Sequence, residues 1–144
     1  MRRFIIVIIT FSLLLIAGCG GENIDSENEK NVGEVSIVDW EHSTLYTDTD
    51  IKTAIDTVIA YFETEFKGCT LTQISYPGDD SSGLFDKWAK EYEADEAIVL
   101  YSSFDTDSSG GDGSLNPNST YNDWQWILVK NNGGVWELKT YGYG

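Results

Sequence analysis

The sequence predicts an α+β domain, in which a long N-terminal helix and a short second helix pack on an antiparallel sheet of about four strands. Three features support this fold class. An apolar stripe with helical spacing runs through residues 50–67, and a continuous apolar run over residues 97–101 is typical of a central strand, which we expect to continue to about residue 104. A strong hairpin signal follows at Asn132-Gly133. The predicted order is helix, strand, helix and three strands, and we expect both helices on one face of the sheet.

The first helix is predicted over residues 50–67, where apolar side chains recur every three or four positions and therefore share one face. Thr47 or Thr49 can cap its start, because a side-chain oxygen accepts a hydrogen bond from an unpaired backbone N–H. Gly68 suits the left-handed backbone that often ends a helix. The stripe consists of Ile51, Ile55, Val58, Ile59, Phe62 and Phe66.

A strand and a second helix are predicted next. Residues 69–76 are rich in Thr and Ile, and they end at the Pro77-Gly78 turn. Ser81 or Ser82 can then cap a shorter helix. Its apolar side is predicted to consist of Leu84, Phe85, Trp88 and Tyr92.

The last two strands are predicted to form a hairpin around residues 130–134, because Asn-Gly supplies the positive φ angles of a tight turn. Folding at this turn pairs Val129 with Trp136 and Ile127 with Leu138. These four side chains then share one face, since strand side chains alternate. The opposite face, which we expect to be at least partly covered or to form a site, carries Trp124, Trp126, Leu128 and Tyr141.

The beginning of the chain has the layout of a secretory signal. Arg2 and Arg3 precede an apolar run from Phe4 to Ala17. As a helix this run would rise roughly 21 Å, which is short for a hydrocarbon core of about 30 Å. We therefore expect residues 1–18 to be a signal peptide that is removed.

The end of that run, Leu15-Ile16-Ala17-Gly18-Cys19, resembles the bacterial lipobox. The resemblance implies that the Cys19 thiol is diacylated and that Cys19 becomes the new N-terminus, anchored in a membrane on its extracytoplasmic side. Two acyl chains suffice for stable anchoring. The polar residues after Cys19 predict a flexible tether over 19–33, followed by a single domain over 34–144.

The charge balance is strongly acidic. The chain has 9 Lys+Arg against 24 Asp+Glu, a net charge of −15, and loss of Arg2 and Arg3 leaves 7 against 24, or −17. Such a surface repels phosphate polyanions and so argues against nucleic acid as a partner. Cations, cationic peptides and simple solubility are the remaining interpretations.

The chain has only two cysteines and one histidine. If Cys19 carries lipid, Cys69 has no intramolecular partner, and we expect it to be a buried small hydrophobe. A reactive or intermolecular thiol is the alternative. His42 is expected on the surface, and it provides neither a histidine-based zinc site nor a Cys/His or Ser/His/Asp catalytic arrangement.

The long helix followed by Trp126-Ile127-Leu128-Val129 and residues 133–138 resembles the nuclear-transport-factor-2-like (cystatin-like) group. The resemblance covers about residues 50–144 and implies a curved sheet that wraps the long helix into a cone, with a pocket at its mouth. Residues 68–71 and 108–121 resemble a narrower, uncharacterised family of firmicute-type lipoproteins. Neither resemblance implies catalysis, because no Asp–His pair corresponds to the one found in enzymes of the wider group.

The acidic, glycine-rich segment after residue 104 follows the opening of a calcium-binding loop, D-x-[DN]-x-[DNS]-G. Hard calcium ions prefer oxygen ligands, and glycine allows the sharp turn. The twelfth position carries Asn116 instead of a bidentate Glu, so a polar loop with ordinary turn residues is the alternative. The candidate metal ligands are Asp105, Asp107, Ser109, Gly111 and Asp112.

Five tryptophans are present, and most of them are expected in the core. Trp124 and Trp126 are the expected exceptions. Together with Tyr121 they lie close to the acidic loop along the chain, and we predict that these three residues bind a ligand.

These features favour a membrane-anchored, non-catalytic binding or interaction module whose partner is a small ligand, a peptide or a membrane protein. One alternative is a hydrolase of envelope glycans, which needs two carboxyl groups roughly 5–10 Å apart. The other alternative is a sensory accessory subunit of a membrane complex, since similar modules are attached to membrane sensor proteins.

Overall fold

The computed structural model describes residues 34–144, so the predicted signal peptide, the lipidation site Cys19 and the tether lie outside the described residues. None of the helices in the described part is long and apolar enough to cross a membrane. The elements are β1 (Ser36–Ile37), α1 (Asp48–Glu65), β2 (Cys69–Ser75), the 3-10 helix η1 (Asp79–Ser81), α2 (Ser82–Glu91), β3 (Glu96–Thr106), β4 (Thr120–Lys130) and β5 (Glu137–Gly142).

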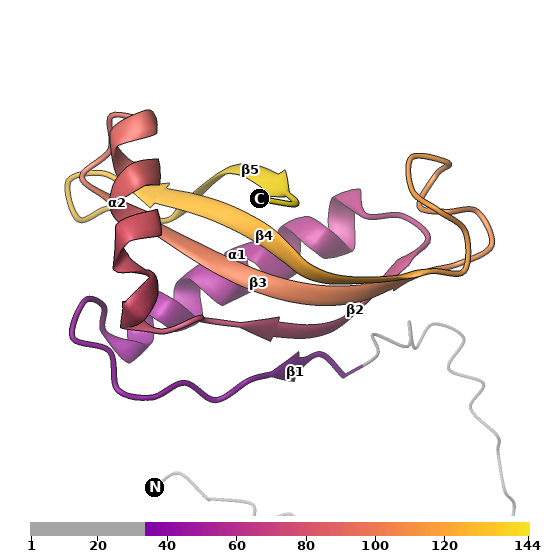
Figure 1. The fold of residues 1–144 in the computed structure, drawn as a ribbon, viewed down its shortest axis with the longest axis horizontal. Helices are drawn as coiled ribbons and strands as arrows, with labels where there is room; N and C mark the ends of the chain where they lie inside the picture. Colours follow the sequence, from indigo (N-terminus) through magenta and orange to yellow (C-terminus); the bar gives the residue numbers. More distant parts are fainter. Residues whose placement is uncertain (1–33) are drawn as a thin grey trace, which may run out of the picture. The chain divides into compact units, whose positions relative to one another are not determined.

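The domain is α+β, as predicted, but its sheet has five strands in the order β1-β2-β3-β4-β5 and is mixed (Figure 1). The additional strand is β1, which pairs in parallel with β2 through Ser36 and Gln73. Because β1 precedes α1, the long helix is not the first element of the domain. A helix between two neighbouring strands is the usual way to make them parallel, and α1 joins β1 to β2 in this way. The other neighbouring strands, from β2 to β5, pair antiparallel.

Helix α1 confirms the predicted apolar stripe, with bounds two residues earlier than expected. Thr47 and Asp50 form a reciprocal capping box, in which the Thr47 hydroxyl accepts from the Asp50 N–H at 3.1 Å. Phe66 leaves helical geometry and ends the helix, and Gly68 follows with a φ of 69°. The buried face consists of Ile51, Ala54, Ile55, Val58 and Phe62.

The two helices lie on opposite faces of the sheet, so the expectation of helices on one face is wrong. Figure 1 shows α1 behind the sheet and α2 in front of it. On the α1 side, the Trp126 ring contacts Phe62 and Phe66. Helix α2 packs against β3 and β4, whose alternate side chains on that side are buried as well: Ala97, Val99, Ile127 and Val129. Burial on both faces explains why residues 97–100 are continuously apolar.

The hairpin has the predicted turn but not the predicted register. Asn132 and Gly133 have φ angles of 53° and 62°, as the Asn-Gly signal requires. However, Val129 pairs with Glu137 instead of Trp136, and a bulge between Ile127 and Leu128 shifts the remaining pairs.

The register follows from Trp136, which packs against α1 ahead of β5. Its indole N–H donates to the Asp50 carbonyl at 2.9 Å, and the Lys130 ammonium lies 4.6 Å from the ring centroid. As a result, Leu138 pairs with Leu128 and Tyr141 with Trp126. The aromatic face that we expected to be at least partly covered, or to form a site, is therefore the core face packed on α1.

Candidate functional site

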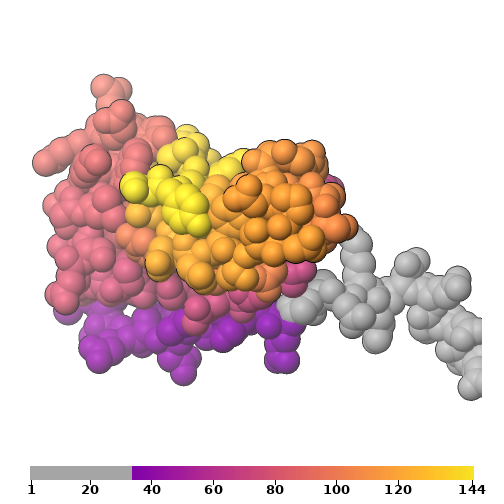
Figure 2. Space-filling model, turned by 45° about the vertical axis from the view of Figure 1, so that its right-hand side comes forward, coloured from indigo at the N-terminus to yellow at the C-terminus, as the bar shows by residue number. Residues whose placement is uncertain are grey.

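A pocket of about 320 Å³ lies at the end of the domain where α1 stops and the loop of residues 107–119 closes over the start of β2. Figure 2 shows the C-terminal residues in yellow beside the orange residues of β4 and this loop. Two other pockets border α2 and contain none of the predicted site residues. The lining residues are Glu65, Phe66, Lys67, Cys69, Gly111, Asp112, Ser114, Leu115, Trp124 and Tyr141.

Three aromatic rings from three elements form one side of this pocket. The centroid of the Phe66 ring is 5.2 Å from that of Tyr141 and 6.3 Å from that of Trp124, and the Trp124 and Tyr141 centroids are 6.2 Å apart. Phe66 is available because it lies just past the end of α1. Trp126 packs behind Phe66 and Tyr141. The core face of the sheet therefore continues into the pocket as an aromatic surface.

Trp124 is the residue in which core and pocket meet. Its ring is nearly perpendicular to those of Phe66, Phe104 and Tyr121. Its indole Nε1 is buried and has no hydrogen-bond partner. A buried donor without a partner is costly, so Trp124 is less well satisfied than Trp126, which donates to the Ser102 hydroxyl at 2.8 Å.

The loop forms the opposite side and is held by backbone contacts. The Asp107 N–H donates to the Gly68 carbonyl at 2.8 Å, and the Asn118 N–H donates to the Asp107 carbonyl at 2.9 Å. Gly111 is buried with a φ of 56°, and a Cβ at this position would lie 2.9 Å from Cys69 Sγ. Only glycine combines this backbone conformation with such a close approach. The loop wall is therefore held by these backbone hydrogen bonds and by the close approach of Gly111 to Cys69.

The pocket has a negative electrostatic environment. Glu65 and Asp112 line it, against the single lysine Lys67. Burial raises the pKa of the Cys69 thiol, and the negative charges of Asp107 and Asp112 raise it further. Cys69 consequently stays a protonated thiol at neutral pH, which makes it a poor nucleophile. It is half-buried rather than fully buried as expected.

The three aromatic residues predicted to bind a ligand have three different roles. Trp124 lines the pocket. Trp126 is fully buried and has no access to solvent. Tyr121 stacks on Phe104 with a centroid distance of 5.1 Å, and its hydroxyl accepts from the Asn116 N–H at 2.9 Å. Trp126 and Tyr121 thus support the pocket and its loop from behind.

The predicted calcium ligands are not gathered around one point. Asp105 accepts from the Thr120 hydroxyl, Asp107 from the Ser109 N–H and hydroxyl, and the Gly111 carbonyl from the Ser114 hydroxyl. Within residues 34–144, no three His, Cys, Asp or Glu side chains form a group that could hold a metal. Calcium binding stays a prediction. Of the five candidate ligands, Gly111 and Asp112 line the pocket.

The sequence interpretation missed Phe66, Cys69 and Tyr141 as pocket residues. Phe66 and Tyr141 were assigned by their periodicity to a helix stripe and a strand face, and only the end of α1 and the hairpin register bring them together. A usable signal was present at Gly68-Cys69. Residues 68–71 and 108–121 carry the same resemblance in the sequence, and in the structure Gly68 and Cys69 lie against this loop.

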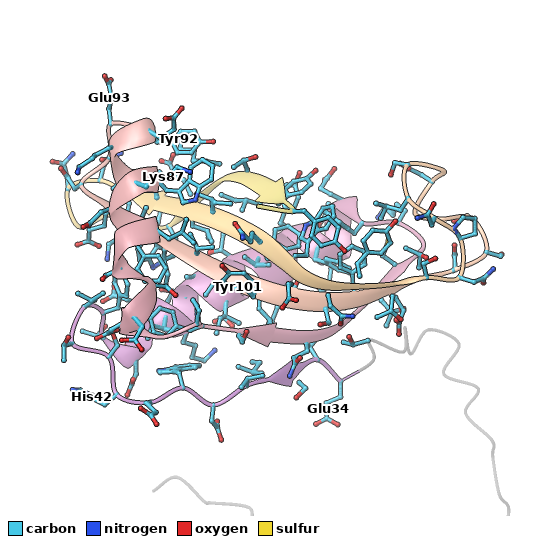
Figure 3. The ribbon with its side chains drawn as sticks, in the orientation of Figure 1. Glu34, His42, Lys87, Tyr92, Glu93 and Tyr101 are labelled. Carbon is cyan, nitrogen blue, oxygen red and sulfur yellow. The ribbon has the colours of Figure 1, made fainter. Side chains whose placement is uncertain are left out.

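His42 takes no part in this site. It is exposed, as predicted, and Figure 3 shows it on the segment between β1 and α1, at the far end of the domain from the loop of residues 107–119.

No family model, no curated protein and no solved structure matches the chain. The resemblance to the nuclear-transport-factor-2-like group therefore stays a prediction, and the site has to be interpreted from its own geometry.

Proposed function

We propose that residues 34–144 form a non-catalytic binding module, which takes a small ligand or one side chain of a peptide into the pocket between Phe66, Trp124 and the loop. The observation that carries the proposal is the construction of this pocket. Its walls come from α1, β4, β5 and a loop held by hydrogen bonds, so the walls are ordered before a ligand arrives. Its volume of about 320 Å³ is at the lower end of the range for small-molecule sites.

The ionisation of the nearby groups supports binding rather than catalysis. The Cys69 thiol has a raised pKa, the opposite of an activated nucleophile. Hydrogen bonds from Ser109 lower the pKa of the neighbouring Asp107, which keeps this carboxyl ionised. A hydrolase of glycans needs one carboxyl with a raised pKa to act as the acid. A binding module needs no such group.

We further propose that this module is displayed outside the cell on a lipid anchor at Cys19. The lipobox-like segment before Cys19 and the polar composition of residues 20–33 support this placement. A membrane-anchored module would meet small solutes and peptides that are already outside the cell, or a membrane protein beside it.

A ligand panel tests the binding function. The full chain in non-ionic detergent micelles would be screened by ligand-observed NMR against neutral saccharides, organic cations, organic anions and short peptides. Each binder would be repeated with Ser114→Trp, which places a large ring at an exposed position on the pocket rim. We expect at least one class to bind the wild-type protein and to lose its signal with this variant.

Ser108→Trp is the matched control, because Ser108 is exposed in the same loop but does not line the pocket. It should bind like wild type. Binders that are indifferent to Ser114→Trp, or the absence of any binder in the panel, would contradict the proposed function.

A further inference from the structure

We infer that the pocket recognises an organic cation, such as the ammonium or guanidinium group of a small amine or of a basic side chain. This inference rests on the proposed binding function and specifies the ligand. Three independent features of the described residues support it: the aromatic surface, the local carboxylates and the charge of the whole domain.

The aromatic surface is suited to a cation. Phe66, Trp124 and Tyr141 line one side of the pocket, and the face of an aromatic ring attracts a cation through its quadrupole. The same chemistry already occurs twice in this domain. The Lys130 ammonium lies 4.6 Å from the centroid of the Trp136 ring, and the Lys87 ammonium lies 5.4 Å from that of Trp88.

Carboxylates border this surface. Glu65 is the last residue of α1, and Asp112 lies in the loop on the other side of the pocket. Asp107 adds to the field, since its charge and that of Asp112 both raise the pKa of the Cys69 thiol in the pocket wall. A cation in the pocket, bound against the rings, therefore has carboxylates from both α1 and the loop near it.

Lys67 opposes this preference, because it is the one basic residue among those that line the pocket. Its side chain is exposed, so the ammonium can stay in solvent while the stem remains at the pocket edge. The lysine gives the inference a sharp test, because removing its charge should have the opposite effect to removing that of Asp112.

The charge of the domain favours the same ligand over long distances. Three of the 9 Lys+Arg and four of the 24 Asp+Glu precede residue 34, which leaves 6 against 20 in the described part. A net negative domain attracts cations and repels anions, and salt weakens this attraction. Neutral saccharides would stack on the same rings but gain nothing from the charge.

Two probes of equal shape separate these alternatives. The n-butylguanidinium ion and n-butylurea differ mainly in charge, and each would be titrated into the full chain in non-ionic detergent micelles at low salt. We expect the cation to bind about ten-fold more tightly than the urea, as cation–π and carboxylate contacts together predict. Added salt should reduce this preference.

Charge variants locate the effect in the pocket. Asp112→Asn should weaken binding of n-butylguanidinium about two- to five-fold, and Lys67→Gln should strengthen it by a similar factor. Asn is suited to position 112, because it tolerates the φ of 63° that Asp112 adopts. The matched control is Asp123→Asn, which removes the same charge from an exposed residue with a φ of 55° outside the pocket.

Other outcomes would overturn the inference in distinct ways. Equal binding of both probes, lost in Ser114→Trp, would leave the pocket as a binding site but contradict its preference for cations. An unchanged or stronger complex of n-butylguanidinium with Asp112→Asn would show that this carboxylate does not attract the cation, and would overturn the inference. Failure of both probes, while another class in the panel binds in a Ser114-dependent way, would reject organic cations and retain the binding function.

Discussion

At the scale of single residues, Asp79 connects two distant parts of the chain. Its carboxylate accepts from the Ser43 hydroxyl at 2.6 Å, the Thr44 N–H at 2.7 Å and the Tyr76 hydroxyl at 2.8 Å. The Ser43 bond contributes most to lowering the pKa of Asp79, followed by the Thr44 N–H. The pKa of Tyr76 is raised in turn, to about 12. Burial is the main cause and the hydrogen bond to the Asp79 carboxylate adds to it, whereas the hydrogen bond with Ser43 lowers the pKa.

This linkage predicts how stability depends on pH. The folded-state pKa of Asp79 lies below the unfolded value of about 3.9, so its contribution is present above about pH 4 and is lost as the pH falls through the folded-state pKa. Between about pH 4 and pH 2, the urea midpoint of Asp79→Asn should therefore fall less than that of wild type. Asp80→Asn changes the exposed neighbouring residue, and its urea midpoint should fall as that of wild type does. Parallel curves for wild type and Asp79→Asn would refute the linkage.

A second residue-scale prediction concerns the loop wall at Gly111. Gly111→Ala imposes a positive φ on alanine and places its Cβ 2.9 Å from Cys69 Sγ, so we expect a loss of about 1–3 kcal/mol in the free energy of unfolding. Adding Cys69→Ala should recover part of this loss, because it removes the sulfur. Gly113→Ala is the control for backbone strain alone, since its Cβ meets nothing within 4 Å. No recovery in the double variant would show that the contact is unimportant.

At the scale of elements, the start of α1 gives a clear choice between two threonines. Thr47 accepts from the Asp50 N–H, whereas Thr49 lies inside the helix. Thr47→Ala should lower the free energy of unfolding by about 1 kcal/mol, the usual loss for an N-cap. Thr49→Ala should have a much smaller effect, measured by urea unfolding of both variants. The reverse order would place the cap at Thr49.

The elements themselves were largely predictable because each depends on local patterns. The stripe of α1, the strand before Pro77 and the Asn132-Gly133 turn are all encoded within a few residues. What escaped prediction depends on distant contacts. The two-residue strand β1 forms only because β2 lies beside it, and the hairpin register depends on Trp136 reaching Asp50 on α1.

At the scale of the whole molecule, the anchor should be separable from the domain. If Cys19 is acylated, labelled palmitate should be incorporated into wild type and Cys69→Ser but not into Cys19→Ser, as shown by gel fluorography of membrane fractions. Cys69 is the natural control because it is the only other cysteine. Label retained in Cys19→Ser would contradict the lipobox interpretation.

The site was predicted only in part, because it is made where four segments meet. Trp124 and the loop were singled out from their nearness in sequence, and the structure brings them together. Phe66 and Tyr141 join them through the end of α1 and the register shift between β4 and β5, which no local pattern encodes. Trp126, by contrast, was predicted to bind a ligand but is buried in the core, because strand alternation alone does not reveal which face of the hairpin packs on α1.

The claim that the pocket is the binding site is tested most directly by the indole N–H resonances of the five tryptophans. The Trp124 signal would be assigned with Trp124→Phe and followed in a ¹⁵N-labelled full chain during titration with n-butylguanidinium. We predict that this signal shifts, while that of Trp88 on α2 does not. A shift at Trp88 with an unchanged Trp124 signal would place binding beside α2 and contradict the account.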